Sequence, residues 1–121
     1  MIRLTILAFA LFGFASGAPA AVDTASPKID RMVKDALKDY SEKHEDTYVK
    51  LTALLEGQQS NDEYTVRLLA EPTVCSISTA KNSDDIQKCN VDRKQETLLC
   101  SGTITPKTHK QNLKCAEQVF I

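Results

Sequence analysis

Apolar side chains recur at spacings of three and four residues after Pro27, and charged residues fill the positions between them. This spacing predicts an amphipathic helix with one buried face. Ser26 and Pro27 indicate where the helix begins, because serine is a favoured N-cap residue and proline is tolerated at the first helical position. We expect the helix to fade in the polar segment 41–46. The predicted buried face consists of Ile29, Met32, Val33, Ala36, Leu37 and Tyr40.

The period of the apolar pattern then changes to two. Alternation over 48–55 and again over 63–70 predicts two half-buried strands. The polar segment 57–62 between them contains Gly57 and has the composition of a turn, so the two strands should form a hairpin. The predicted buried sides are Val49, Leu51, Ala53 and Leu55 in the first strand and Tyr64, Val66, Leu68 and Ala70 in the second.

Further β-rich segments follow at 73–78, 97–105 and 113–121, with a loop at 80–85 and a turn at 106–112. A helix with one apolar stripe and a sheet with one apolar face bury both surfaces by packing together. The sequence therefore predicts the α+β class: one N-terminal α-helix packed on a four- to five-stranded antiparallel sheet. The chain length suits a single domain, which we expect to span residues 26–121.

The beginning of the chain has the layout of a secretory signal peptide. A short segment with one positive charge precedes an uncharged apolar run at 4–15, and small residues follow. The run is too short to span a bilayer as a helix. We predict that residues 1–17 are a signal peptide, cleaved after Gly17 or alternatively after Ala20, and that 18–25 form a flexible N-terminus. We expect a secreted, extracellular protein with no membrane association after cleavage.

Four cysteines lie in the predicted mature chain, and an even number in an oxidising compartment predicts disulfides. Zinc sites usually bring their ligands in close pairs such as C-x2-C, whereas all of these cysteines are widely spaced, so we predict no metal. Four cysteines allow three pairings, and spacing leaves all three open. The cysteines are Cys75, Cys89, Cys100 and Cys115.

Charge and motifs exclude several functions. The formal net charge of −1 gives no electrostatic basis for binding nucleic acid, which requires a basic domain. The two histidines, His44 and His109, lie in polar segments without a nucleophile in a recognisable local motif. The sequence contains neither a G-x-S-x-G elbow nor a glycine-rich phosphate loop. We therefore predict a protein that is not an enzyme and that binds no cofactor.

The order of these elements and cysteines resembles the cystatin superfamily, and the resemblance covers the chain from residue 26 to its end. The match is densest around the cysteines. The segments 72–75, 100–105 and 113–115 are similar to those of the cathelin-like branch, which carries T-V-C and C-x-G-T-[VI]-T motifs. The resemblance implies the sequential disulfides Cys75–Cys89 and Cys100–Cys115.

Inhibitory cystatins insert a three-part wedge into the cleft of papain-like cysteine proteases. The parts are a glycine-containing N-terminal segment, a first hairpin with Q-x-V-x-G and a second hairpin with P-W. The resemblance aligns Gly57 with the glycine of the first hairpin, where a missing side chain lets backbone approach the cleft. It aligns Leu55 with the valine and Ala53 with the glutamine, and Glu56 should lie close to the tip.

The second hairpin offers Pro106 and Lys107 in place of the Pro-Trp pair, and the chain contains no tryptophan. The resemblance thus implies a scaffold with altered inhibitory motifs. We favour a monomeric inhibitor whose partner is a papain-like cysteine protease. The alternative is a non-inhibitory, cathelin-like secreted module that serves binding or an accessory role.

Overall fold

The computed structural model describes residues 20–117. The predicted signal peptide 1–17, the predicted cleavage site after Gly17 and the end of the predicted last strand lie outside the described residues. Within the described part, no helix combines the length and apolarity needed to cross a bilayer. The elements in chain order are β1 (Ala20–Ala21), α1 (Pro27–His44), β2 (Thr47–Ser60), β3 (Glu63–Ser76), α2 (Ser83–Gln87), β4 (Leu98–Thr105), the 3-10 turn η2 (Pro106–Thr108) and β5 (Lys110–Glu117).

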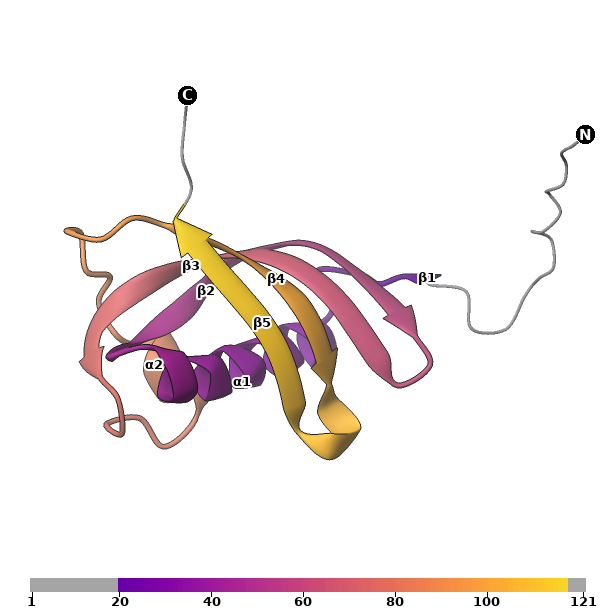
Figure 1. Ribbon diagram of the computed structural model, residues 1–121, viewed down its shortest axis with the longest axis horizontal. Coiled ribbons are helices and arrows are strands. Elements are labelled where there is room, and N and C mark those ends of the chain that lie inside the picture. Colours follow the sequence, from indigo (N-terminus) through magenta and orange to yellow (C-terminus); the bar gives the residue numbers. More distant parts are fainter. Residues whose placement is uncertain (1–19, 118–121) are drawn as a thin grey trace, which may run out of the picture.

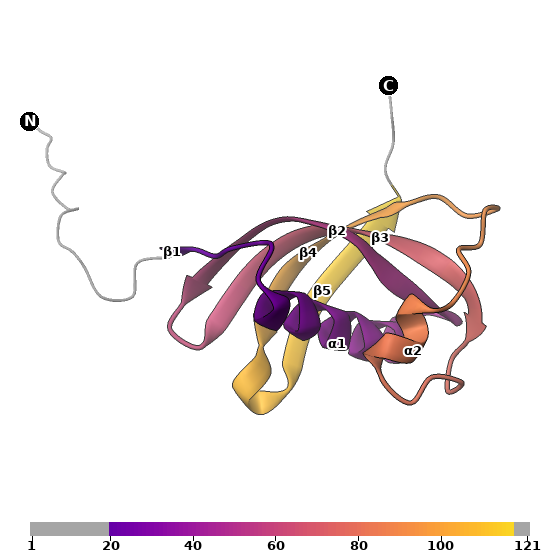
Figure 2. The same cartoon turned by 180° about the vertical axis from the view of Figure 1, so that it is seen from behind.

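The five strands form one sheet in the order β1-β2-β3-β4-β5, and every neighbouring pair is antiparallel. The sheet curves over α1, which covers its concave face in both views (Figure 1 and Figure 2). The predicted α+β class, with one long helix on an antiparallel sheet, is confirmed. The apolar faces of the helix and the sheet meet in a core that contains Val33, Leu37, Val66 and Leu68.

Helix α1 begins at Pro27 directly after Ser26, as the sequence predicts, and it continues to His44. The helix therefore ends within the segment 41–46, as expected. Ser41, at the start of that segment, is nevertheless buried. Its hydroxyl donates to the carbonyl oxygen of Leu37 (2.8 Å) and accepts from the backbone N–H of Val49 (3.1 Å). A polar residue therefore continues the buried face of the helix.

Strand β2 departs from simple alternation. Its register against β3 shifts between Leu51 and Ala53 and again between Leu54 and Glu56. Each irregularity of this kind reverses the face that later side chains occupy. Leu54 consequently packs against the core, while Leu55 is 43% exposed. The prediction that Leu55 faces the core is wrong for this reason.

The other strands follow their predicted positions more closely. The alternating residues of β3 that were expected to be buried, from Tyr64 to Ala70, are buried. Strand β3 also runs through Pro72, which pairs with Val49. Strand β5 begins at Lys110, so the turn before it is shorter than the predicted 106–112.

The long connection between β3 and β4 contains α2 where the sequence predicts a loop. The Asn82 side chain accepts a hydrogen bond from the backbone N–H of Asp85 and caps this helix. The Gln87 side chain accepts from the backbone N–H of Leu51 (3.2 Å). The connection thereby covers part of the β2 edge that β1 leaves unpaired, and an uncovered strand edge would be open to other chains.

Both disulfides have the sequential pairing that the family resemblance implies, Cys75–Cys89 and Cys100–Cys115. The first ties the end of β3 to the connection after α2. The second joins directly opposite residues of β4 and β5. No cysteine in residues 20–117 is free. The disulfides therefore fix the half of the sheet that follows β2.

Candidate functional site

Three segments meet at one end of the sheet. The turns after β2 and after β4 lie at the same end because neighbouring strands are antiparallel, and β1 pairs with β2 next to the first turn. Figure 1 and Figure 2 both show the two hairpins projecting side by side beyond α1. We call β1 together with the turns 60–63 and 105–109 the hairpin edge.

The first turn is tight and polar. Ser60 pairs with Glu63, so only Asn61 and Asp62 lie between the strands. Asn61 has a φ of 58°, in the left-handed region that asparagine tolerates better than most residues. The Gln59 side chain donates to the carbonyl oxygen of Asn61 (3.1 Å). This turn therefore presents short polar side chains rather than an apolar anchor.

The residues that the resemblance aligns with the first wedge motif lie along β2, before this turn. Ala53 pairs with Leu69 and Gly57 pairs with Val66, both well inside the strand. Glu56 forms an exposed ion pair with Arg67 (3.2 Å). The sequence predicts Glu56 close to the tip, but the residue lies four positions before the first turn. The first turn is instead made by Asn61 and the residue after it. The dipeptide Asn61-Asp62 is the sequence feature that indicates this turn, because both residue types tolerate positive φ.

The second turn contains both of the residues that the resemblance aligns with the second hairpin. Pro106 and Lys107 form η2, and His109 follows in the left-handed region with a φ of 55°. The His109 backbone N–H donates to the carbonyl oxygen of Pro106 (3.1 Å). All three side chains are exposed, so this turn also projects from the sheet as a polar tip.

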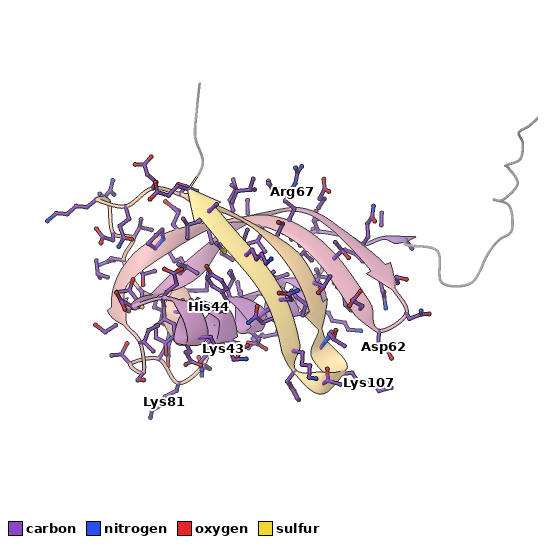
Figure 3. The ribbon with its side chains drawn as sticks, viewed as in Figure 1. Lys43, His44, Asp62, Arg67, Lys81 and Lys107 are labelled. Atoms are coloured by element: carbon purple, nitrogen blue, oxygen red, sulfur yellow. A yellow bond between two sulfur atoms is a disulfide. The ribbon has the colours of Figure 1, made fainter. Side chains whose placement is uncertain are left out.

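An ion pair spans the two turns. The ammonium group of Lys107 lies 3.9 Å from a carboxylate oxygen of Asp62, and the side chains are 77% and 69% exposed. Figure 3 shows both at the tips of neighbouring hairpins. Such an exposed pair contributes little stability. The ion pair shows, however, that the two tips are close enough to contact one partner together.

The third segment is held by backbone pairing. Ala20 pairs with Gln59 and Ala21 with Gln58, and the backbone N–H of Val22 donates to the carbonyl oxygen of Gly57 (3.0 Å). The sequence predicts a flexible segment over 18–25, and the structure places its described part in a strand and a hydrogen-bonded turn. This pairing is possible because the edge of β2 offers backbone groups that a featureless segment can use.

The two tips of the hairpin edge differ in charge. Among residues 20–117, no group of three or more histidine, cysteine or acidic side chains could hold a metal ion, and every cysteine there is in a disulfide. Asp62 and Glu63 make the first tip acidic, whereas Lys107 makes the second tip basic. The edge therefore presents opposite charges on its two tips.

The sequence matches the cystatin domain family over residues 17–109. The chain belongs to this family. The match includes β1 and both turns of the hairpin edge. No match was found among curated protein sequences. The cystatin-family assignment does not bear on the narrower resemblance to the cathelin-like branch, which stays a prediction.

Solved structures share this cystatin fold at low sequence identity. Dimeric human cystatin F has a TM-score of 0.67 at 13% identity, covering 93% of this chain and 98% of that one. A salivary cystatin from the soft tick Ornithodoros moubata has a TM-score of 0.64 at 15% identity, covering 85% and 98%. The structure titled Al-CPI has a TM-score of 0.64 at 16% identity, covering 84% and 100%. At these identities the likeness establishes the fold alone.

Proposed function

We propose that this cystatin-family protein is a secreted inhibitor of papain-like cysteine proteases and that its hairpin edge enters the protease cleft as a wedge. The observation that carries the proposal is the convergence of β1 and two hairpin turns at one end of the sheet, with Asp62 and Lys107 spanning the tips. Two disulfides support a secreted protein, because they persist in oxidising compartments. The signal-peptide layout of the first twenty residues supports the same localisation.

Within this proposal, the contacts come from the turns themselves. The segment 60–63 takes the place of the first wedge motif, and Pro106 with Lys107 takes the place of the second. Ala53, Leu55 and Glu56 lie too far back along β2 to enter a cleft first. Gly57 contributes through Val22, the residue that follows β1, whose backbone N–H donates to its carbonyl oxygen.

The polarity of both tips predicts weak inhibition. Tightly bound interfaces usually depend on a few buried aromatic or arginine side chains, and the chain has no tryptophan. Charged tips also lose hydration when they enter a cleft. The same observation favours the second candidate function, a non-inhibitory binding module that uses the scaffold without the wedge.

We predict that Lys107→Trp strengthens inhibition of papain at least tenfold, because one aromatic anchor commonly contributes about 2 kcal/mol or more and 1.4 kcal/mol is tenfold in affinity. The measurement is the inhibition constant of the mature, disulfide-bonded protein. Lys94→Trp is the matched control, since Lys94 is also an exposed lysine but lies in the β3–β4 connection, away from the hairpin edge.

If the wedge contacts the protease, only the substitution in the second turn changes the inhibition constant. Equal effects of both substitutions would contradict contact through the hairpin edge. Failure of the unmodified protein and of Lys107→Trp to inhibit at micromolar concentration would favour the binding module.

A further inference from the structure

Gly57 contacts Val22, the residue that directly follows the N-terminal strand β1. It is buried within β2 and pairs with Val66, whose side chain faces the core. The Val22 side chain packs against the same core, and its backbone N–H donates to the Gly57 carbonyl oxygen (3.0 Å). Gly57 therefore contacts Val22 in two ways. Its carbonyl oxygen accepts a hydrogen bond from the Val22 backbone, and the Val22 side chain lies where a Cβ atom of residue 57 would be.

The contact with Val22 explains why this position is a glycine. A Cβ atom added to Gly57 would lie 2.7 Å from Cγ2 of Val22, a separation that real Cβ atoms essentially never show. The next nearest atoms, in Val66 and Thr65, lie at ordinary contact distances of 3.7 and 3.9 Å. The backbone of Gly57 is not in the left-handed region, so an alanine could adopt it. Of these three atoms, only Cγ2 of Val22 lies too close for an added Cβ atom.

The Val22 side chain has little freedom to avoid such a contact, because a β-branched residue is restricted about χ1. The next residue, Asp23, accepts two hydrogen bonds in a turn. The backbone N–H of Ser26 donates to the carbonyl oxygen of Asp23 (3.0 Å), and the N–H of Ala25 donates to the Asp23 carboxylate (2.9 Å). This turn leads directly into α1, so Val22 lies between its hydrogen bond to β2 and a hydrogen-bonded turn that precedes the helix.

We propose that Gly57 and Val22 form a latch that holds the N-terminal segment at the hairpin edge. Gly57 is then a positioning residue for the N-terminal part of the wedge, an inference that rests on the proposed inhibitory function. Within the described residues, strand β1 comprises Ala20 and Ala21, and the latch adds a further point of attachment at Val22. A held segment loses less conformational entropy on binding than a free one, which strengthens and speeds association.

The latch is tested by a double-mutant cycle in the full mature protein, with Gly57→Ala, Val22→Ala and the combination. The measurement is amide hydrogen exchange at Val22, whose N–H donates to the Gly57 carbonyl oxygen. Gly57→Ala should accelerate exchange at Val22 at least tenfold. In the Val22→Ala background, which lacks Cγ2, the same glycine substitution should change exchange less than about threefold. Ser101→Ala is the control, since this exposed residue lies on β4.

Two outcomes would overturn the latch. One is exchange at Val22 that Gly57→Ala leaves unchanged. The other is an acceleration of the same size in both backgrounds, which would mean that alanine disturbs β2 itself. Because hydrogen exchange needs no protease, this result stands whether or not the protein inhibits one.

The positioning role is tested by papain inhibition. Gly57→Ala should weaken inhibition at least fivefold, while in the Val22→Ala background the same change should have less than a twofold effect. If the unmodified protein inhibits and Gly57→Ala inhibits equally well, the latch does not serve the wedge and this role is overturned. If neither the unmodified protein nor Lys107→Trp inhibits, the proposed function and the positioning role both fail, and the exchange experiment alone decides the latch.

Discussion

A single buried hydroxyl joins the end of α1 to the beginning of β2. Ser41 is fully buried, donates to the Leu37 carbonyl oxygen and accepts from the Val49 backbone N–H. The Val49 N–H is itself buried, so it depends on this acceptor. An unpaired buried donor costs more than an average hydrogen bond contributes, because it loses its hydration without replacement.

We predict that Ser41→Ala lowers the free energy of unfolding by about 1–3 kcal/mol, since it removes the acceptor for the Val49 N–H. Urea denaturation of the two proteins measures the difference. Ser101→Ala, at an exposed position, should change the free energy by less than about 0.5 kcal/mol. A Ser41→Ala protein as stable as that control would show that the buried hydroxyl contributes nothing.

Tyr40 makes a polar contact at the same end of α1. Its hydroxyl donates to the Glu45 carboxylate (3.0 Å), and its ring lies 5.1 Å from that of His44 between ring centroids. Burial, together with the hydrogen bond and charge of Glu45, raises the pKa of Tyr40 from 10.0 to about 12. The folded protein therefore keeps the phenol proton at a pH where the unfolded chain releases it.

This difference predicts a loss of stability in alkali. Below the unfolded pKa of 10.0, both states hold the proton and the stabilising contribution is complete. As the pH rises toward the folded pKa of about 12, the unfolded state binds fewer protons, so the free energy of unfolding falls. Tyr40→Phe removes the titrating group and should show a shallower decline in urea titrations across this range. Parallel declines in the two proteins would contradict the raised pKa.

At the scale of elements, the irregular register of β2 decides which leucine supports the core. Leu54 packs against the core, while its neighbour Leu55 is exposed on the other face. Regular alternation would assign them the other way round. The two residues are both leucines at adjacent positions, so substitutions at them can be compared directly.

We predict that Leu54→Ala lowers the free energy of unfolding by about 2–3 kcal/mol, because it removes packed apolar volume. Leu55→Ala should change it by less than about 0.5 kcal/mol. Thermal or urea unfolding of both variants measures the contrast. The reverse order would mean that β2 keeps the regular alternation that its sequence suggests.

The elements that the sequence predicts correctly are those determined by local interactions. The start of α1 follows from Ser26 and Pro27, and the buried side of β3 follows from its alternation. The faces of β2 depend on its register with β3, which no local pattern records. Strand β1 is likewise set by a distant partner, because Ala20 pairs with Gln59.

The candidate site also contains one part that local interactions determine and one part that depends on a distant contact. Pro106 and Lys107 occur in a turn because proline and the polar residues after it form one locally. The sequence predicts the first turn too early because Gly57 has the character of a hairpin glycine. The need for a glycine at position 57 depends on contact with Val22. Val22 is distant in the chain, and nothing in the sequence around it indicates this contact. Sequence spacing cannot reveal a glycine that is required by such a contact.

At the scale of the whole molecule, the order of strands in the sheet is their order in the chain. Each strand therefore pairs only with its sequence neighbours. Helix α1 contacts β2 and β5, so it connects the two sides of this meander. Between β2 and β5, the one long connection is 77–97, and Cys75–Cys89 bridges most of it.

This topology has a consequence for the rate of folding. Neighbouring strands joined by short turns meet after small loop closures, and such local topologies fold quickly. Pairing β3 with β4 is the exception, since about 22 residues must close in the reduced chain and about 10 when the Cys75–Cys89 bridge is present. The difference in closure entropy is about 0.7 kcal/mol, or about threefold in the rate of that step. The reduced chain should therefore form its sheet almost as fast as the oxidised one, with the first disulfide acting mainly to keep the folded connection in place.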